Sequence, residues 1–215
     1  MRVNQGEGSG SNALEAGLYP AVCSSIIDIG TQHGEWQGKE KILHKIIIGF
    51  ELVEETYEKD GVTQRMHTSD FYTASLFHQA KMFKHLTKWR GKDFTPEELK
   101  NFELKNILGV PCVIDLEVNS NGKNNIDMIR PYKGETVLGL DGETRHFCLR
   151  EDPDDNERVT FDGNFPEWMS DGIRGLVEKS DEYRIFTGDL IPESEAPSAT
   201  TKPLPSTEFD EDIPF

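Results

Sequence analysis

Three places in the sequence combine basic side chains with an aromatic residue, a combination whose chemistry is binding rather than bond breaking. A basic groove attracts the phosphates of a nucleic-acid strand, and exposed aromatic rings stack on its bases, each stack being worth about 1–3 kcal/mol. Neither interaction depends on base sequence. The residues predicted to contact a single strand are Trp36, Lys39, Lys41, Arg65, Phe71, Tyr72, Lys81, Lys84, Lys88, Trp89 and Arg90.

Each of these places also has a purely structural explanation. Trp36 lies in a predicted glycine-flanked loop, Gly30–Gly38, where it either stacks on a base or anchors the loop. Alternation along the next strand but one puts Phe71 and Tyr72 on opposite sides, so that one of them faces the core. The lysines that follow share one face of a predicted helix, which is either a phosphate-binding stripe or simply the solvated side of that helix.

The sequence lacks the spacing patterns by which common enzymes hold a nucleophile, a phosphate or a metal ion. It contains no glycine-rich phosphate loop with Lys-Ser/Thr, no Gly-x-Ser-x-Gly elbow and no His-Glu-x-x-His. His78 and His85 are seven residues apart, but no cysteine or spaced carboxylates accompany them. We therefore predict no catalytic residue, no metal and no cofactor, and interpret Cys23 and Cys112 as buried thiols.

Hydrophobic periodicity predicts a mainly β fold, an OB-fold β-barrel of five strands with a helical insertion between the third and fourth. Turn sequences mark the hairpins, with Asp60-Gly61 after the second strand and Asn121-Gly122 after the fourth. Thr95, followed by Pro96, marks the start of a helix. The expected strands span residues 18–29, 41–53, 64–73, 110–118 and 125–129, and the expected helices begin near residues 75 and 95.

Beyond the fifth strand the pattern is weaker. Residues 136–149 are predicted to form a hairpin around Asp141-Gly142, and residues 166–183 a short amphipathic helix. We expect both to belong to an extension packed on the barrel. The expected domains are a flexible leader (1–16), a binding barrel (17–133), the extension (134–188) and a disordered linker and tip (189–215).

Charge is distributed unevenly, which changes what the formal net charge of -16 implies. A strongly acidic protein is normally repelled by nucleic acid. Residues 19–133 nevertheless hold 15 basic and 16 acidic side chains, whereas residues 134–215 hold 7 and 21. The predicted barrel is thus nearly neutral and has room for a basic face. No apolar run approaches the roughly 18 residues of a membrane span, so we expect a cytoplasmic protein with no membrane partner.

The last eight residues, Glu208–Phe215, combine four acidic side chains with an apolar Ile-Pro-Phe end. An exposed phenylalanine at a free chain end gains nothing in water. It gains free energy if it enters an apolar pocket on a partner whose basic residues hold the terminal carboxylate. We therefore predict a partner-binding tip, made of Asp210, Glu211, Asp212, Ile213, Pro214 and Phe215.

The tip resembles that of bacterial single-stranded DNA-binding proteins, which ends in an acidic run followed by Ile-Pro-Phe. The likeness covers Phe209–Phe215, with Glu211 where that family usually has Asp. In that family the terminal Pro-Phe docks on enzymes of replication, recombination and repair, so the resemblance gives Asp212–Phe215 this role. The body of the chain, by its opening segment Gly17–Gly30, is more similar to phage-encoded single-stranded DNA-binding proteins with a divergent OB-fold.

Together these features predict sequence-nonspecific binding of single-stranded DNA in a bacterial or phage-infected cell, in DNA replication, recombination and repair. The tip is expected to recruit a polymerase, helicase, primase, nuclease or recombinase. Two alternatives stay open: a recombination mediator, annealing or accessory protein whose barrel binds protein, and an enzyme of DNA metabolism with an added tail. The sequence leaves both a monomer and a homo-oligomer open.

Overall fold

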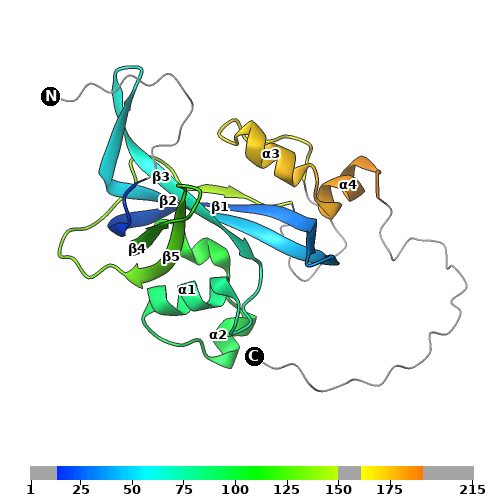
Figure 1. The fold of residues 1–215 in the computed structure, drawn as a ribbon, viewed down its shortest axis with the longest axis horizontal. Helices are drawn as coiled ribbons and strands as arrows, with labels where there is room; N and C mark the ends of the chain where they lie inside the picture. Colours follow the sequence, from blue (N-terminus) through cyan, green and yellow to red (C-terminus); the bar gives the residue numbers. More distant parts are fainter. Residues whose placement is uncertain (1–13, 150–160, 191–215) are drawn as a thin grey trace, which may run out of the picture.

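The structure, a computed structural model, describes residues 14–149 and 161–190. It is mainly β, with one six-stranded sheet and several short helices (Figure 1). Five strands pair antiparallel in the order β3-β2-β1-β4-β5, and the sixth pairs parallel with β1. The strands are β1 (Gly17–Trp36), β2 (Lys39–Lys59), β3 (Val62–Thr73), β4 (Pro111–Val118), β5 (Asn124–Pro131) and β6 (Arg145–Phe147).

β1 and β2 form one long hairpin around a two-residue turn. Both turn residues, Gln37 and Gly38, have positive φ angles of 52° and 75°, which match the twist of the flanking strands. The predicted loop over Gly30–Gly38 is therefore wrong, because β1 continues to Trp36 past a bulge between Asp28 and Gly30. A bulge lets a strand bend and twist more strongly without ending it. The predicted turns after β2 and β4 are confirmed.

The sheet curls but does not close. The sequence predicted a closed barrel of five strands. The prediction of a closed barrel is wrong, because within the described ranges no hydrogen-bonded ladder joins β3 to β5. Instead α1 (Lys81–Arg90) packs against both strands, and Met82, Leu86 and Trp89 of this helix join the core on the concave side. The helix thus packs against the two edge strands that a closed barrel would pair.

The segment between β3 and β4 is helical, and its α1 and 3₁₀ turn pack on one side of the sheet. Its helices are α1, α2 (Pro96–Lys100) and the 3₁₀ turn η1 (Leu104–Ile107). α2 begins as predicted, because the Thr95 hydroxyl accepts from the Glu98 N–H while the Glu98 carboxylate accepts from the Thr95 N–H. α1 begins later than predicted, after Ala80. At the predicted start, the Ser75 hydroxyl instead accepts from the Phe77 N–H in a local turn.

The part of the extension that the structure describes lies on the opposite side of the sheet. β6 continues the edge of β1 that β4 begins, since β4 pairs with residues 17–22 and β6 with residues 25–27. α3 (Asp171–Val177) and α4 (Asp181–Thr187) follow, and Figure 1 shows them away from α1 and α2 across the strands. A second apolar core joins them to the sheet, made of Ile27, Ile29, Ile47, Phe147, Leu149, Phe161, Met169 and Val177.

Two predictions for the extension are wrong. The hairpin over residues 136–149 does not form, because β6 pairs with β1 instead. The single helix over residues 166–183 is two helices, and Ser180 begins the second by accepting from the Tyr183 N–H at 3.2 Å. A Cβ atom built on Gly30, whose φ is 71°, would lie 2.6 Å from the Ser180 Cβ. The start of α4 thus approaches β1 so closely that only glycine fits there.

Much of the predicted leader and nearly all of the predicted disordered tail fall on residues 1–13 and 191–215, which lie outside the described ranges. The end of the leader is held in place, because the Leu14 N–H donates to the Asn124 Oδ1 at 2.8 Å. None of the helices in the described part of the chain has the length and apolar character needed to cross a membrane.

Candidate nucleic-acid interface

A groove of about 810 Å³ lies on the face of β1, β2 and β3 that carries the extension. It lies between these strands and two parts of the extension, the segment that leads into β6 and the residues around the start of α3. Its lining residues are Ser24, Ser25, Ile27, Ile47, Gly49, Phe50, Glu51, Gln64, Arg65, His67, Thr68, Ser69, Asp141, Gly142, Glu143, Thr144, Arg145, Trp168, Ser170 and Ile173.

Small residues keep the floor of the groove low. Gly49 of β2 pairs with Ser25 of β1 on one side and with Ser69 of β3 on the other. A Cβ atom at position 49 would lie 2.2 Å from the Ser25 Oγ, so a larger residue there would displace this hydroxyl. The floor is therefore low and polar, which allows a flat ring or a phosphate to approach the backbone.

A buried carboxylate links the two sides of the groove. Glu51 is 5% exposed, and its Oε1 accepts from the Arg65 guanidinium and from the Asp141 N–H, each at 2.8 Å. Arg65 also donates to the Gly139 carbonyl oxygen at 2.7 Å. Charge-assisted hydrogen bonds of this kind are about twice as strong as neutral ones. They fix the segment before β6 against the sheet and hold one guanidinium at the groove.

The extension contributes a second cation and an aromatic ring. The Arg145 guanidinium carbon lies 5.8 Å from the centroid of the Trp168 ring, within the range of a cation–π contact. His67 faces the same space from β3: burial lowers its pKa, Glu51 partly opposes this, and Arg145 lowers the pKa further. His67 is consequently neutral near pH 7. The fixed positive charges of the groove are therefore its two guanidinium groups.

β3 places its predicted site residues as alternation requires. Phe71 is 51% exposed, and its partner on β2, Ile47, lines the groove, so the ring extends the same face. Tyr72 points the other way, is 2% exposed and has its hydroxyl 3.0 Å from the His85 Nδ1. Burial raises the pKa of Tyr72. Its assignment to the DNA site is corrected: Tyr72 is a core residue, because the curled sheet needs one apolar face.

The predicted lysines of α1 divide into two kinds. Lys84 and Lys88 lie on the exposed side of the helix. Lys81 is ion-paired with Asp70 of β3, and its Nζ lies 5.6 Å from the centroid of the Tyr72 ring. None of these lysines lines the groove, which lies on the other face of the sheet.

Trp89 and Arg90 are structural residues, which corrects their assignment as DNA contacts. Trp89 is 5% exposed, and its Nε1 donates to the Pro111 carbonyl oxygen at 2.9 Å. The Arg90 guanidinium lies 4.0 Å from the centroid of the Phe94 ring and is ion-paired with Glu98. Both side chains are committed to contacts that hold the end of α1 against its neighbours.

The remaining predicted residues lie elsewhere. Lys39 and Lys41 are exposed near the β1–β2 turn and do not line the groove. The Trp36 side chain and the tip, residues 210–215, lie outside what the structure describes. Of the predicted DNA contacts whose side chains the structure describes, Arg65 is the one that lines the groove.

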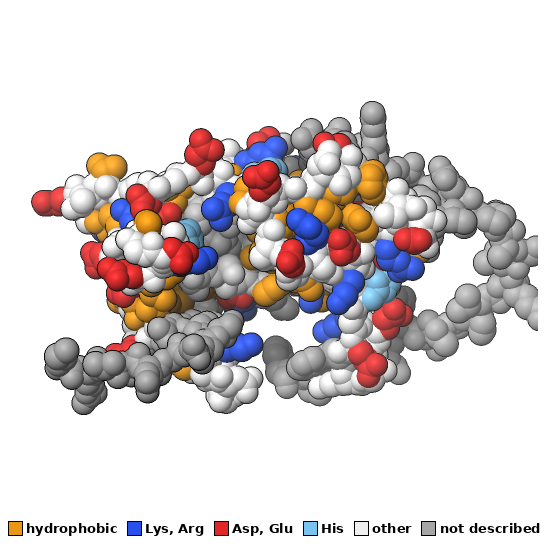
Figure 2. Space-filling view, turned by 90° about the horizontal axis from the view of Figure 1, so that it is seen from above, with side chains coloured by type: hydrophobic (Ala, Val, Ile, Leu, Met, Phe, Trp, Pro, Cys, Tyr) orange, Lys and Arg blue, Asp and Glu red, His pale blue; other side chains and the backbone are white. Residues whose placement is uncertain are grey.

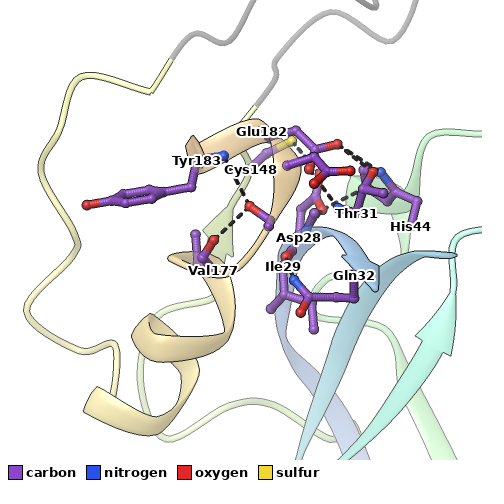
Figure 3. A network of polar contacts seen from close by, with 12 residues as sticks. Asp28, Ile29, Thr31, Gln32, His44, Cys148, Val177, Glu182 and Tyr183 are labelled. Carbon is purple, nitrogen blue, oxygen red and sulfur yellow. Dashed lines mark hydrogen bonds and ion pairs between the residues drawn. The ribbon is translucent and has the colours of Figure 1, made fainter. Parts of the chain in front are cut away.

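A polar network holds α4 against β1 and β2 (Figure 3). Glu182 is 1% exposed and accepts from the Thr31 N–H at 2.6 Å and from the Thr31 hydroxyl at 2.8 Å. The His44 imidazole lies between two carboxylates, with its Nδ1 3.5 Å from Glu182 and its Nε2 2.8 Å from Asp28. Asp28 also accepts from the Cys148 thiol at 3.3 Å.

The charges of this network reinforce one another. Hydrogen bonds to Asp28 and then to Glu182 raise the pKa of His44 to about 9. Burial raises the pKa of Glu182, but hydrogen bonds from His44 and Thr31 outweigh it and bring that pKa to about 2. His44 is therefore cationic at neutral pH, and Glu182 is ionised. The network fastens the extension, and with it one side of the groove, to the sheet.

Sequence reasoning missed Glu51, Arg145 and Trp168 as residues of the site. A signal existed for Glu51, because it is a lone acid inside the apolar run of β2, where a charge needs a buried partner. Arg145 and Trp168 carried no such signal, since they reach the groove through the pairing of β6 with β1 and through the second core. Among the described residues, no cluster of three or more His, Cys, Asp or Glu side chains is placed to hold a metal ion.

Comparison of the chain with protein-family models, with curated proteins and with solved structures found no match.

Proposed function

We propose that this protein binds single-stranded DNA without sequence preference, in replication, recombination and repair. The observation that carries the proposal is the groove, which combines two guanidinium groups, an aromatic ring and a small polar floor. These are the groups that single-strand binding requires: cations for the phosphates and flat rings for the bases.

The order of the strands supports the proposal. A β3-β2-β1-β4-β5 sheet with a helix between β3 and β4 is the arrangement expected for a divergent, open OB-fold. OB-folds bind oligonucleotides on the face of their second and third strands. The groove lies along β2 and β3, and Phe71 extends that face.

The charge of the site sets how strongly salt acts on binding. Figure 2 shows basic and acidic side chains interspersed over one face rather than gathered by sign. The groove likewise contains three acids, Glu51, Asp141 and Glu143, beside its two guanidiniums. Each phosphate neutralised adds about -0.7 to the slope of log affinity against log salt. We therefore expect a shallow slope and binding that relies on stacking.

The C-terminal tip gives the protein a second task in this proposal. Asp210–Phe215 recruits enzymes of DNA metabolism, as its resemblance to the tip of bacterial single-stranded DNA-binding proteins implies. The groove and the tip then act on different ligands, one on the strand and the other on a polymerase, helicase, primase, nuclease or recombinase. In this proposal the protein works in the cytoplasm.

Fluorescence anisotropy with labelled oligo-dT and with a duplex of equal length tests the proposal. At low salt, oligo-dT should bind at micromolar protein or below, and the duplex much more weakly. No rise in oligo-dT anisotropy at tens of micromolar protein would contradict the proposal that the protein binds DNA.

A second candidate function is the binding of a protein partner by the body of the chain. It is favoured by an apolar groove of about 540 Å³ between α1, η1 and the ends of β4 and β5. Trp89, Phe102, Ile107 and Tyr132 are among its lining residues. A mediator or accessory protein would retain its partner after substitutions in the β2–β3 groove and would not bind oligo-dT.

A further inference from the structure

The tryptophan that lines the groove comes from the extension rather than from the sheet. Trp168 borders the groove beside Ser170 and Ile173. Trp89, by contrast, is 5% exposed beneath the sheet and cannot reach a strand in the groove. Phe71 is exposed on the same face but is not a lining residue.

The backbone around Trp168 is fixed from both sides. The Met169 N–H donates to the Pro166 carbonyl oxygen at 2.9 Å, and the Met169 side chain is 3% exposed in the second core. On the other side, the Ser170 hydroxyl accepts from the Ile173 N–H and begins α3. The Trp168 ring packs partly against the same core. A ring held in this way loses little freedom when a ligand stacks on it.

A cation lies over the ring. Arg145 reaches the groove from β6, with its guanidinium 5.8 Å from the Trp168 ring centroid. In a nucleotide the phosphate and the base are joined through one sugar, so a site for one nucleotide needs a stacking surface and a cation side by side. Across the groove, Arg65 is held by Glu51 and the Gly139 carbonyl, which leaves it less free to turn toward a phosphate.

We propose that Trp168 and Arg145 form a nucleotide subsite, in which a base takes the place of the guanidinium over the indole and stacks there, while the guanidinium turns to pair with an adjoining phosphate. The inference rests on the proposed function and deepens it, because it makes the extension a working half of the DNA site. The groove volume of about 810 Å³ lies within the range of single-ligand pockets. It therefore accepts a short stretch of strand, with the low floor at Gly49 beneath it.

The test uses the full chain labelled with 5-fluorotryptophan. Each of the three tryptophans gives one ¹⁹F resonance, and Trp36→Phe and Trp168→Phe assign them without disturbing the buried Trp89. On titration with oligo-dT, the Trp168 resonance should shift or broaden strongly, while that of Trp89 stays unchanged. In anisotropy, Trp168→Ala should weaken binding about 5- to 150-fold, the equivalent of one lost stack. Trp168→Phe, which keeps a ring, should lose about fivefold or less.

The outcomes separate the subsite from the function on which it rests. If oligo-dT raises the anisotropy of the wild type but leaves the Trp168 resonance in place, the subsite is wrong and DNA binding stands. If the wild type binds no oligo-dT, the proposed function fails first. Because the indole packs partly on the core, Arg145→Gln provides a second variant that leaves the core intact. Unchanged affinity for oligo-dT in Arg145→Gln would also overturn the subsite.

Discussion

Replacing Glu182 with alanine removes the carboxylate that joins α4 to both β1 and β2. The substitution leaves the Thr31 N–H and hydroxyl without this acceptor and leaves His44 with Asp28 as its remaining carboxylate. Glu182 is 1% exposed, so water does not readily replace the lost partner. His44 is 35% exposed and keeps Asp28, so the main cost is that of leaving buried donors without their acceptor, about 1–3 kcal/mol. We expect the free energy of unfolding of Glu182→Ala to fall by about this amount.

The neighbouring residue of the same helix provides the matched control. Asp181 pairs with His33 at 2.8 Å, but that imidazole is 40% exposed. Exposed ion pairs contribute about 0–1 kcal/mol, so Asp181→Asn should change stability by no more than this. Glu182→Gln keeps an acceptor for Thr31 and loses only the charge, so it should fall between the two. Urea unfolding followed by circular dichroism measures all three variants against the wild type.

A local readout distinguishes release of the extension from general destabilisation. If the network fastens the extension, limited proteolysis of Glu182→Ala should cleave within residues 161–190 faster than in the wild type, while residues 17–131 stay protected. Equal stability of Glu182→Ala and Asp181→Asn would refute the reasoning. It would mean that the apolar contacts of the second core hold the extension without the charges.

Three further predictions concern pH, salt and the tip. The pKa of His44 in the folded protein, about 9, lies above its ordinary value of 6.5, so its contribution to stability is full below pH 6.5 and is lost as pH rises through 9. Between these pH values the urea midpoint should fall less steeply in His44→Gln than in the wild type. Parallel plots of urea midpoint against pH for the two proteins would contradict this. Arg145→Gln should reduce the salt slope of oligo-dT binding by about 0.7, whereas Lys100→Gln on α2 should leave it unchanged; equal slopes in the two variants would count against the guanidinium as a phosphate contact. Deleting residues 208–215 should abolish capture of partner enzymes in a pull-down. By removing acids that compete with phosphates, the deletion should also tighten DNA binding at low salt. Unchanged DNA affinity would contradict the competition, whereas the capture assay tests recruitment separately.

Local signals allowed much of the β fold to be predicted from the sequence. Asp60-Gly61 and Asn121-Gly122 mark turns through their own backbone preferences, and the Thr95–Glu98 capping box depends on residues three apart. The burial of Trp89 was also accessible, because Met82, Leu86 and Trp89 repeat at helical spacing and all three are buried. The basic neighbours of Trp89 drew the prediction toward DNA instead.

Features that depend on distant pairing could not be predicted from local patterns. β6 is three residues long, and its partner in β1 lies more than one hundred residues earlier in the chain. The two cores take isoleucines from opposite faces of β1 and β2, so the sequence pattern indicates only strands that are buried on both faces. Since the extension reaches the sheet through these contacts, Trp168 and Arg145 become site residues only in the folded chain.

Photo-crosslinking tests most directly whether the groove holds a single strand. Oligo-dT carrying 4-thiothymidine at each position in turn is bound to the full chain, irradiated, and the crosslinked peptides are identified by mass spectrometry. If the groove holds the strand, crosslinks form in β2 and β3 around Gly49 and Phe71, and in the extension at Arg145 and Trp168. Crosslinks confined to α1 and the lysines of its exposed side, with none in the groove, would contradict binding there.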